Sequence, residues 1–405
     1  MKPMFRGLIR VVTRLTRVGR LTHAAKVLKR MLSGVPIAVP VPARKPKRQR
    51  TPAMKPKAVS KPQTRSSPDG SQAEKAQTKF GPSRVPGSAA TSAFVAGSYT
   101  HASRTLGYKL YSPPAKADRP LPLVVMLHGC KQDPDDFSVG TGMNERAREQ
   151  GFFVLYPAQS QAANPLRCWN WFKRNHQQRG SGEPALIAGM TQKVVREHGI
   201  DSQRVYVAGL SAGGAMAAIV AAAYPDIFSA VGVHSGLAPG AATSVLGAMS
   251  VMKHGKPGQQ PRAKGSIAGV ASAKRGRPLM PVPTIVFHGD EDATVHPSNG
   301  ERVISAVLER AASADESGAM PVGAPQVEEG ASGEGQRYTR STHRDHSGGA
   351  IAEHWLVHGA GHAWSGGDPA GSFTDAGGPD ATREMLRFFF SHPAGASHRQ
   401  SNLTL

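Results

Sequence analysis

A serine lies between two glycines in residues 209–213, which read Gly-Leu-Ser-Ala-Gly. The residues before it, 204–208, are β-branched and aromatic, as in a buried strand, and residues 214–224 are small and apolar, as in a buried helix. A Gly-x-Ser-x-Gly turn between a strand and a helix strains the backbone of its serine and exposes the hydroxyl at the end of a sheet. The pattern therefore predicts that Ser211 is a nucleophile that attacks carbonyl carbons.

A serine hydroxyl becomes a good nucleophile when a base takes its proton and an acid orients that base. His362 lies in a glycine-rich loop, residues 359–367, that follows a predicted strand. Asp292 lies in the loop after the predicted strand 285–287, farther into the loop than Asp290. We therefore expect His362 as the base and Asp292 as the acid. Asp290 is the second candidate, and its other interpretation is a solvated turn residue.

Acyl transfer also needs two backbone N–H groups that point at the oxyanion formed during attack. The apolar run 122–127 predicts a central parallel strand, and it ends in His128, Gly129 and Cys130. We expect the amide of Cys130, in this loop, and the amide of Ala212, after the nucleophile, to form the oxyanion hole. His128 is expected to be a structural residue that is hydrogen-bonded beneath the loop.

A metal site is the competing interpretation of two of these histidines. His358 and His362 are four residues apart, which on a helix would place two zinc ligands on one face. Gly359 and Gly361 disfavour a helix there. We therefore expect no metal, and the predicted acyl transfer uses no cofactor.

Residues 167–172, Arg-Cys-Trp-Asn-Trp-Phe, form an aromatic segment. Trp169, Trp171 and Phe172 are candidates for lining an acyl or polymer groove, with a place in the core as the alternative. Asn170, between the two tryptophans, is a further candidate substrate-binding residue. The two cysteines of the chain are Cys130 and Cys168. From the residues alone, a disulfide and two reduced thiols are equally open.

The elements that position these residues alternate between strands and helices, which predicts an α/β fold with a mostly parallel sheet covered on both faces. In such a sheet the active-site loops lie at the carboxyl ends of the strands. Together with the serine turn, this indicates an α/β-hydrolase. The expected strands are residues 108–111, 124–127, 153–156, 205–208, 230–234, 285–287 and 355–357, and the expected helices are 142–150, 184–198, 212–224, 299–311 and 379–390.

Four motifs together resemble the poly(3-hydroxybutyrate) depolymerase family of esterases, over roughly residues 92–391. They are Leu-His-Gly-Cys-x-Gln at 127–132, the aromatic segment 167–172, Gly-Leu-Ser-Ala-Gly-Gly-Ala-Met at 209–216 and Gly-His-Ala-Trp at 361–364. The resemblance implies the same triad of Ser211, Asp292 and His362, and it favours a disulfide between Cys130 and Cys168.

The substrate that the resemblance implies is a short-chain 3-hydroxyalkanoate ester, polymeric or oligomeric. The alternative is a feruloyl or acetyl ester on a polysaccharide, because related esterases share the catalytic domain and a fold alone does not fix the substrate. The resemblance also implies an extracellular enzyme. The alternative is a cytoplasmic one, since no ordinary secretory signal is visible in the sequence.

The chain of 405 residues carries a net charge of +22, which is concentrated at its N-terminal end. Residues 1–90 hold 21 Lys and Arg against Asp69 and Glu74, a net charge of +19, so only +3 remains for the rest. Residues 1–35 repeat apolar residues every three or four positions with arginines between, which predicts a basic amphipathic helix. Residues 36–92 are basic and proline-rich, as in a disordered linker.

We expect residues 93–392 to form the catalytic domain and 393–405 a tail. Two internal stretches, 239–281 and 311–349, are rich in glycine or polar residues and are predicted to be largely disordered insertions. The expected partner of the basic helix is an anionic membrane or granule surface. Nucleic acid ranks below it, because Phe5 is the one aromatic residue before Phe80 and base stacking needs aromatic side chains.

Removal of the residues before Thr91 tests this attachment hypothesis. We expect unchanged turnover of a soluble short-chain ester and loss of co-sedimentation with anionic vesicles or polymer granules, because the charge and the apolar helix face are both removed. The full chain with DNA in place of vesicles serves as the comparison for simple charge attraction. A collapse of turnover after truncation would mean that the helix packs on the catalytic domain instead.

Overall fold

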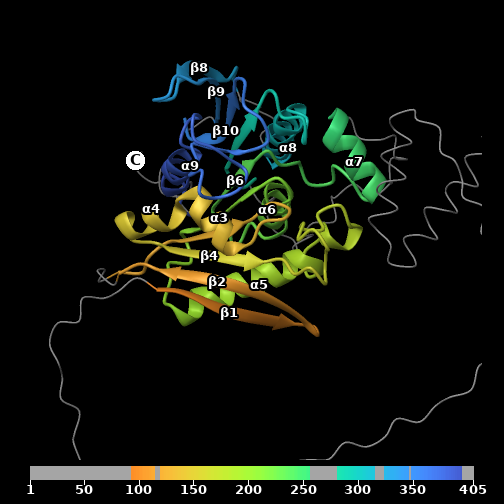
Figure 1. Ribbon diagram of the computed structural model, residues 1–405, viewed down its shortest axis with the longest axis vertical. Coiled ribbons are helices and arrows are strands. Elements are labelled where there is room, and N and C mark those ends of the chain that lie inside the picture. The colour runs from red at the N-terminus through yellow and green to blue at the C-terminus, as the bar shows by residue number, and fades with distance from the viewer. Residues whose placement is uncertain (1–92, 115–118, 256–280, 315–322, 346–347, 395–405) are drawn as a thin grey trace, which may run out of the picture. The chain divides into compact units, whose positions relative to one another are not determined.

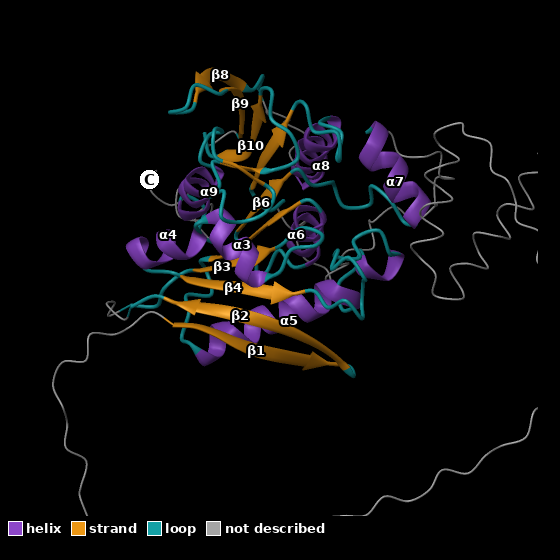
Figure 2. Ribbon diagram, viewed as in Figure 1, coloured by secondary structure: helices purple, strands orange, loops and turns teal. Residues whose placement is uncertain are grey.

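A ten-stranded sheet forms the centre of the computed structural model (Figures 1 and 2). The structure describes residues 93–114, 119–255, 281–314, 323–345 and 348–394, which belong to one unit of the chain, Ser83–Leu405. The predicted basic helix and linker (1–92) and nearly all of the C-terminal tail lie outside the described residues.

The strand order is β1-β2-β4-β3-β5-β6-β7-β10-β9-β8. The six strands from β4 to β10 in this order run parallel, and antiparallel strands flank them on both sides. The bounds are β1 (Ala93–His101), β2 (Arg104–Ser112), β3 (Leu123–Leu127), β4 (Phe153–Ala158), β5 (Val205–Leu210), β6 (Ala230–His234), β7 (Thr284–Gly289), β8 (Gln326–Ala331), β9 (Arg337–Arg344) and β10 (Ala350–Val357). A separate pair, β11 (Trp364–Ser365) and β12 (Thr374–Asp375), follows.

Helices cover both faces of the sheet (Figure 2). The helices are α3 (Pro134–Thr141), α4 (Met143–Gln150), α5 (Gly182–Glu197), α6 (Ala212–Ala223), α7 (Val245–His254), α8 (Ser298–Ala314) and α9 (Ala381–Phe390). One apolar core joins the sheet to α5, α6, α7 and α8, and a second joins it to α3, α4 and α9. Every residue of β3, β5 and β6 is buried, as continuous apolar strands between two helix layers require.

The predicted α/β class with a mostly parallel sheet is confirmed, and each expected strand and helix is present. The prediction of disorder for 311–349 is wrong where the structure describes that stretch: α8 extends to Ala314, and β8 and β9 form a hairpin beside β10. Polar residues build this hairpin through cross-strand charge pairs, for example Glu328 opposite Arg340, so it lacks the apolar pattern of a strand.

The prediction of disorder is also wrong for part of the stretch 239–281, because residues 245–254 form α7. Ser244 caps this helix by accepting the amide of Gly247, and Val251 is buried against the core. Residues 256–280 lie outside the described part of the chain.

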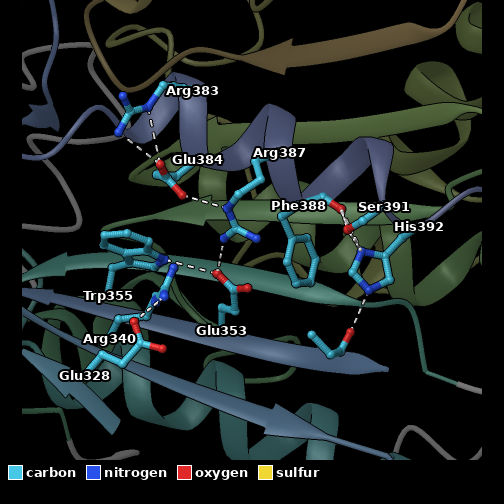
Figure 3. A network of polar contacts seen from close by, with 11 residues as sticks. Glu328, Arg340, Glu353, Trp355, Arg383, Glu384, Arg387, Phe388, Ser391 and His392 are labelled. Carbon is cyan, nitrogen blue, oxygen red and sulfur yellow. Dashed lines mark hydrogen bonds and ion pairs between the residues drawn. The ribbon is translucent and has the colours of Figure 1, made fainter. Parts of the chain in front are cut away.

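A charged network fastens α9 to β10 (Figure 3). Arg387 on the helix donates to Glu353 on the strand over 2.5 Å and to Glu384 over 2.7 Å. Glu353 also accepts from the indole of Trp355, and its side chain is 4% exposed. A buried carboxylate of this kind depends on its cation, because the charge has lost its water.

Replacement Arg387→Met should lower the free energy of unfolding by about 3 kcal/mol, since the buried carboxyl of Glu353 would lose its ion-pair partner. Arg383→Met is the matched control: Arg383 pairs with Glu384 on the same helix but is 67% exposed. Its loss should cost less than about 1 kcal/mol. Urea unfolding of both variants measures the difference, and equal losses would contradict the role assigned to Glu353.

Candidate active site

Ser211 occupies a sharp turn between β5 and α6, with φ 59° and ψ −118°. A positive φ strains the backbone of a residue other than glycine, and such strain persists only where the surrounding structure enforces it. Those surroundings are close: a Cβ on Gly213 would lie 1.9 Å from the carbonyl oxygen of Leu127, and one on Gly209 would lie 2.5 Å from Gly213. Both positions therefore require glycine, as the sequence motif suggested.

His362 and Asp292 form the tightest carboxylate–imidazole pair at this edge of the sheet. Nδ1 of His362 lies 2.7 Å from Oδ2 of Asp292, whose side chain is fully buried. The other oxygen, Oδ1, accepts the amides of Thr294 and Val295. Burial alone would raise the pKa of Asp292, but hydrogen bonds from His288 and His362 outweigh it, so the pKa lies well below its usual value. Asp292 is therefore an anion that holds the Nδ1–H of His362.

Asp290, the second candidate, contacts a different histidine. Its Oδ2 lies 2.9 Å from Nδ1 of His358, and its Oδ1 accepts the amide of Gly359. The other ring nitrogen of His358 lies 2.9 Å from the hydroxyl of Thr339, so both nitrogens of His358 have partners. Within the described residues, Nε2 of His362 has no such partner, which leaves it able to accept a proton.

The Ser211 hydroxyl and His362 are not hydrogen-bonded to each other in the described part of the chain. Ser211 is 7% exposed, and its amide donates to the carbonyl of His234 over 2.8 Å. Hydrogen bonds between catalytic groups are often long without substrate and shorten when it binds.

The loop after β3 lies against the serine turn: a Cβ on Gly129 would meet the carbonyl oxygen of Leu210 at 3.5 Å. Gly129 donates its amide to the side chain of Gln132, and Lys131 donates to the carbonyl of Leu166. The two amides predicted to form the oxyanion hole, those of Cys130 and Ala212, have no acceptor among the described residues. In the loop after β3, the amides of Gly129 and Lys131 are therefore engaged and that of Cys130 is available, and the amide of Ala212 is available in the serine turn.

A disulfide joins Cys130 to Cys168 and ties the loop after β3 to the aromatic segment. His128 lies beneath the same loop, 1% exposed, with Nε2 accepting the amide of Gln159. Nδ1 of His128 donates to the carbonyl of Gly129 over 2.8 Å, and burial lowers the pKa of His128, so the ring is neutral. The structure thus places His128 as a support, as expected.

Three residues of the aromatic segment, 169–171, are buried. Trp169 is fully buried and Asn170 is 2% exposed. Trp169 donates its indole N–H to the carbonyl of His128, and Asn170 donates from its amide and side chain to the buried carboxylate of Glu183. Trp171, 3% exposed, packs edge-on against Phe172. These three residues have their contacts inside the fold, and a substrate-binding role for Trp169, Asn170 and Trp171 stays a prediction.

Sequence reasoning missed two buried polar residues beside these loops. Glu183 organises the aromatic segment, and its partners His176, Gln159 and Asn170 bring three segments together. His234, at the end of β6, contacts both the serine turn and the loop of His362. A polar residue at the carboxyl end of a predicted buried strand was the available signal for His234.

A cavity of about 370 Å³ lies elsewhere, between the β8–β9 turn and the start of α9. Its lining includes Tyr338, Arg340, Trp355 and Arg383, and none of Ser211, Asp292 and His362. Across the described residues, no cluster of three or more His, Cys, Asp or Glu side chains could hold a metal ion. No helix in that part of the chain is both long and apolar enough to span a membrane.

Residues 106–330 match the model of the family described as esterase PHB depolymerase. The chain is 37% identical to poly(3-hydroxyalkanoate) depolymerase C of Paucimonas lemoignei over 185 residues, which are 45% of this chain and 43% of that protein. It is 33% identical to feruloyl esterase B of Thermothelomyces thermophilus over 198 residues, 47% of this chain and 66% of that one. The matches thus span less than two thirds of either relative.

Among solved structures, the acetyl xylan esterase from Aspergillus awamori superposes with a TM-score of 0.53 at 23% identity, covering 71% of this chain and 94% of that one. At this identity the likeness concerns the fold, and it agrees with the predicted α/β-hydrolase architecture.

Proposed function

Because the chain belongs to the esterase PHB depolymerase family, we propose that it is a serine esterase that works through an acyl-enzyme. The relatives it matches are carboxylic ester hydrolases. The observation that carries the proposal is the 2.7 Å pair of His362 and the buried Asp292, at the same sheet edge as a serine held at φ 59°.

In the proposed reaction, Ser211 Oγ attacks the acyl carbon while Nε2 of His362 takes the hydroxyl proton. Asp292 stays ionised and stabilises the imidazolium through Nδ1–H. The amides of Cys130 and Ala212 donate to the oxyanion. His362 then returns its proton to the departing alkoxide, which leaves an acyl-enzyme that a water molecule hydrolyses by the same steps in reverse order.

For the substrate we propose short-chain 3-hydroxyalkanoate esters, with feruloyl or acetyl esters on polysaccharide as the alternative. The support is the 37% identity to a poly(3-hydroxyalkanoate) depolymerase, compared with 33% to a feruloyl esterase over a similar length. The buried residues Trp169, Asn170 and Trp171 give no basis for choosing between these two substrate classes.

We propose an extracellular location, with a catalytic domain of residues 93–392. The Cys130–Cys168 disulfide supports this location, because disulfides persist in oxidising compartments. A cytoplasmic location is the alternative, and surface attachment through residues 1–35 remains a proposal for either.

Replacement Ser211→Ala should lower kcat for a short-chain p-nitrophenyl ester by at least about 10³-fold, since it removes the nucleophile. Asp292→Asn should lower kcat about 10²- to 10⁴-fold because His362 would lose the anion at Nδ1. The matched control is Asp290→Asn, which alters the pair with His358 and should stay within about threefold of wild type. Substantial activity in Ser211→Ala, or a larger loss at Asp290, would contradict these roles.

Product release distinguishes the two substrate classes. We expect 3-hydroxybutyrate to be released from amorphous polymer or its oligomers faster than ferulate from a feruloylated sugar or acetate from acetylated xylan. Ser211→Ala under the same conditions corrects for spontaneous hydrolysis. A strong preference for the aromatic or acetyl ester would replace the proposed substrate with the alternative while leaving the proposed chemistry in place.

A further inference from the structure

His234 is a buried histidine that the proposed reaction does not use. It ends β6, which lies between β5, leading to Ser211, and β7, leading to Asp292. Its side chain is inside the fold, with the residue 1% exposed. The position places one residue next to all three segments that carry the proposed triad.

The backbone of His234 holds the serine turn. Its carbonyl oxygen accepts the amide of Ser211 over 2.8 Å, one residue beyond the β5–β6 pairing of Leu210 with His234. A Cβ on Gly214 would lie 3.0 Å from the same oxygen, so the start of α6 packs directly on it. The nucleophile is therefore fixed relative to the end of β6.

The side chain of His234 holds the loop that carries His362. Nε2 of His234 accepts the amide of Ser365 over 2.9 Å, and the ring stacks on Trp364 with centroids 5.0 Å apart. On its other neighbour, Phe287 of β7, the ring stacks at 5.8 Å. Trp364 and Ser365 follow His362 by two and three residues, so their contacts with His234 set the position of the loop that carries His362.

These contacts fix the protonation of the imidazole. An amide N–H can only donate, so Nε2 of His234 carries the lone pair and Nδ1 carries the proton, 3.3 Å from the hydroxyl of Ser235. Burial, with His288 and His362 adding to it and Asp292 opposing it, lowers the pKa of His234 to about 3. The ring is thus a neutral acceptor at the pH values where an esterase works.

We propose that His234 is a positioning residue that sets the spacing between Ser211 and His362. The inference rests on the proposed function. The backbone of His234 fixes the nucleophile, and its side chain fixes the loop that carries His362. The ring therefore acts as a spacer between Ser211 and His362, which share no hydrogen bond with each other in the described residues. A displacement of about 1 Å between reacting groups is enough to lower a rate about 10²-fold.

Two amide substitutions test the spacer. In the variant His234→Gln, the side-chain amide oxygen can lie near the position of Nε2 and act as an acceptor there. In His234→Asn the side chain is one methylene shorter, so its amide reaches only the position of Nδ1. We expect His234→Gln to keep kcat within about fivefold of wild type, and His234→Asn to lower kcat about 10- to 100-fold. KM should change less than about threefold in both, because His234 does not touch substrate in the proposed reaction.

Thermal unfolding of both variants controls for general damage, because a purely structural role would lower stability without the split between kcat and KM. A wild-type kcat in His234→Asn would overturn the proposal, as would equal losses in both variants or an effect confined to KM. If His234→Asn does not fold, the ¹⁵N shifts of the wild-type ring decide. A proton on Nδ1 from pH 5 to 8 supports the proposal, and a proton on Nε2 or a titrating ring overturns it.

The outcome is separable from that of the proposed function. If Ser211→Ala remains active, the serine mechanism fails and the role of His234 fails with it. If Ser211→Ala is inactive while His234→Asn behaves as wild type, only the positioning role fails.

Discussion

The close approach of α6 to the end of β3 is the constraint on which the rest of the site depends. Gly213 lies so near the carbonyl of Leu127 that a single added carbon would overlap it. This approach brings the turn that carries Ser211 against the loop that carries Cys130, two segments about 80 residues apart in the chain. β5 ends at Leu210 and α6 begins at Ala212, so the whole change from strand to helix falls on Ser211, whose backbone is strained as a result.

Parallel strand order then assembles the remaining groups. β5, β6 and β7 are neighbours, so the residues that follow them share one edge of the sheet. Two aspartates pair with histidines there, and burial distinguishes them: Asp292 is enclosed and accepts two amides, whereas Asp290 is about one third exposed. Enclosure is what makes the charge of Asp292 effective, because little water competes for it.

Residues with a local signature were predictable from the sequence. The turn around Ser211 carries its glycines and its flanking strand and helix, and the parallel strands carry continuous apolar runs. The hairpin β8–β9 was not predictable, because charge pairs such as Glu328 with Arg340 stabilise it across strands instead of an apolar alternation. For Trp169 the sequence left a core position and a groove position both open, because an aromatic residue has the same sequence signature in either until its neighbours are known.

The disulfide between Cys130 and Cys168 has a consequence for how this loop can vary. The group proposed to contact the oxyanion is the backbone N–H of Cys130, which every amino acid except proline would supply equally well. The side chain of the same residue is therefore available for a mechanical task, tying the loop to the segment that packs beneath it. Chemistry and anchorage are thus separable at one position: substitution of the cysteine changes how firmly the donor is held, while the donor itself remains.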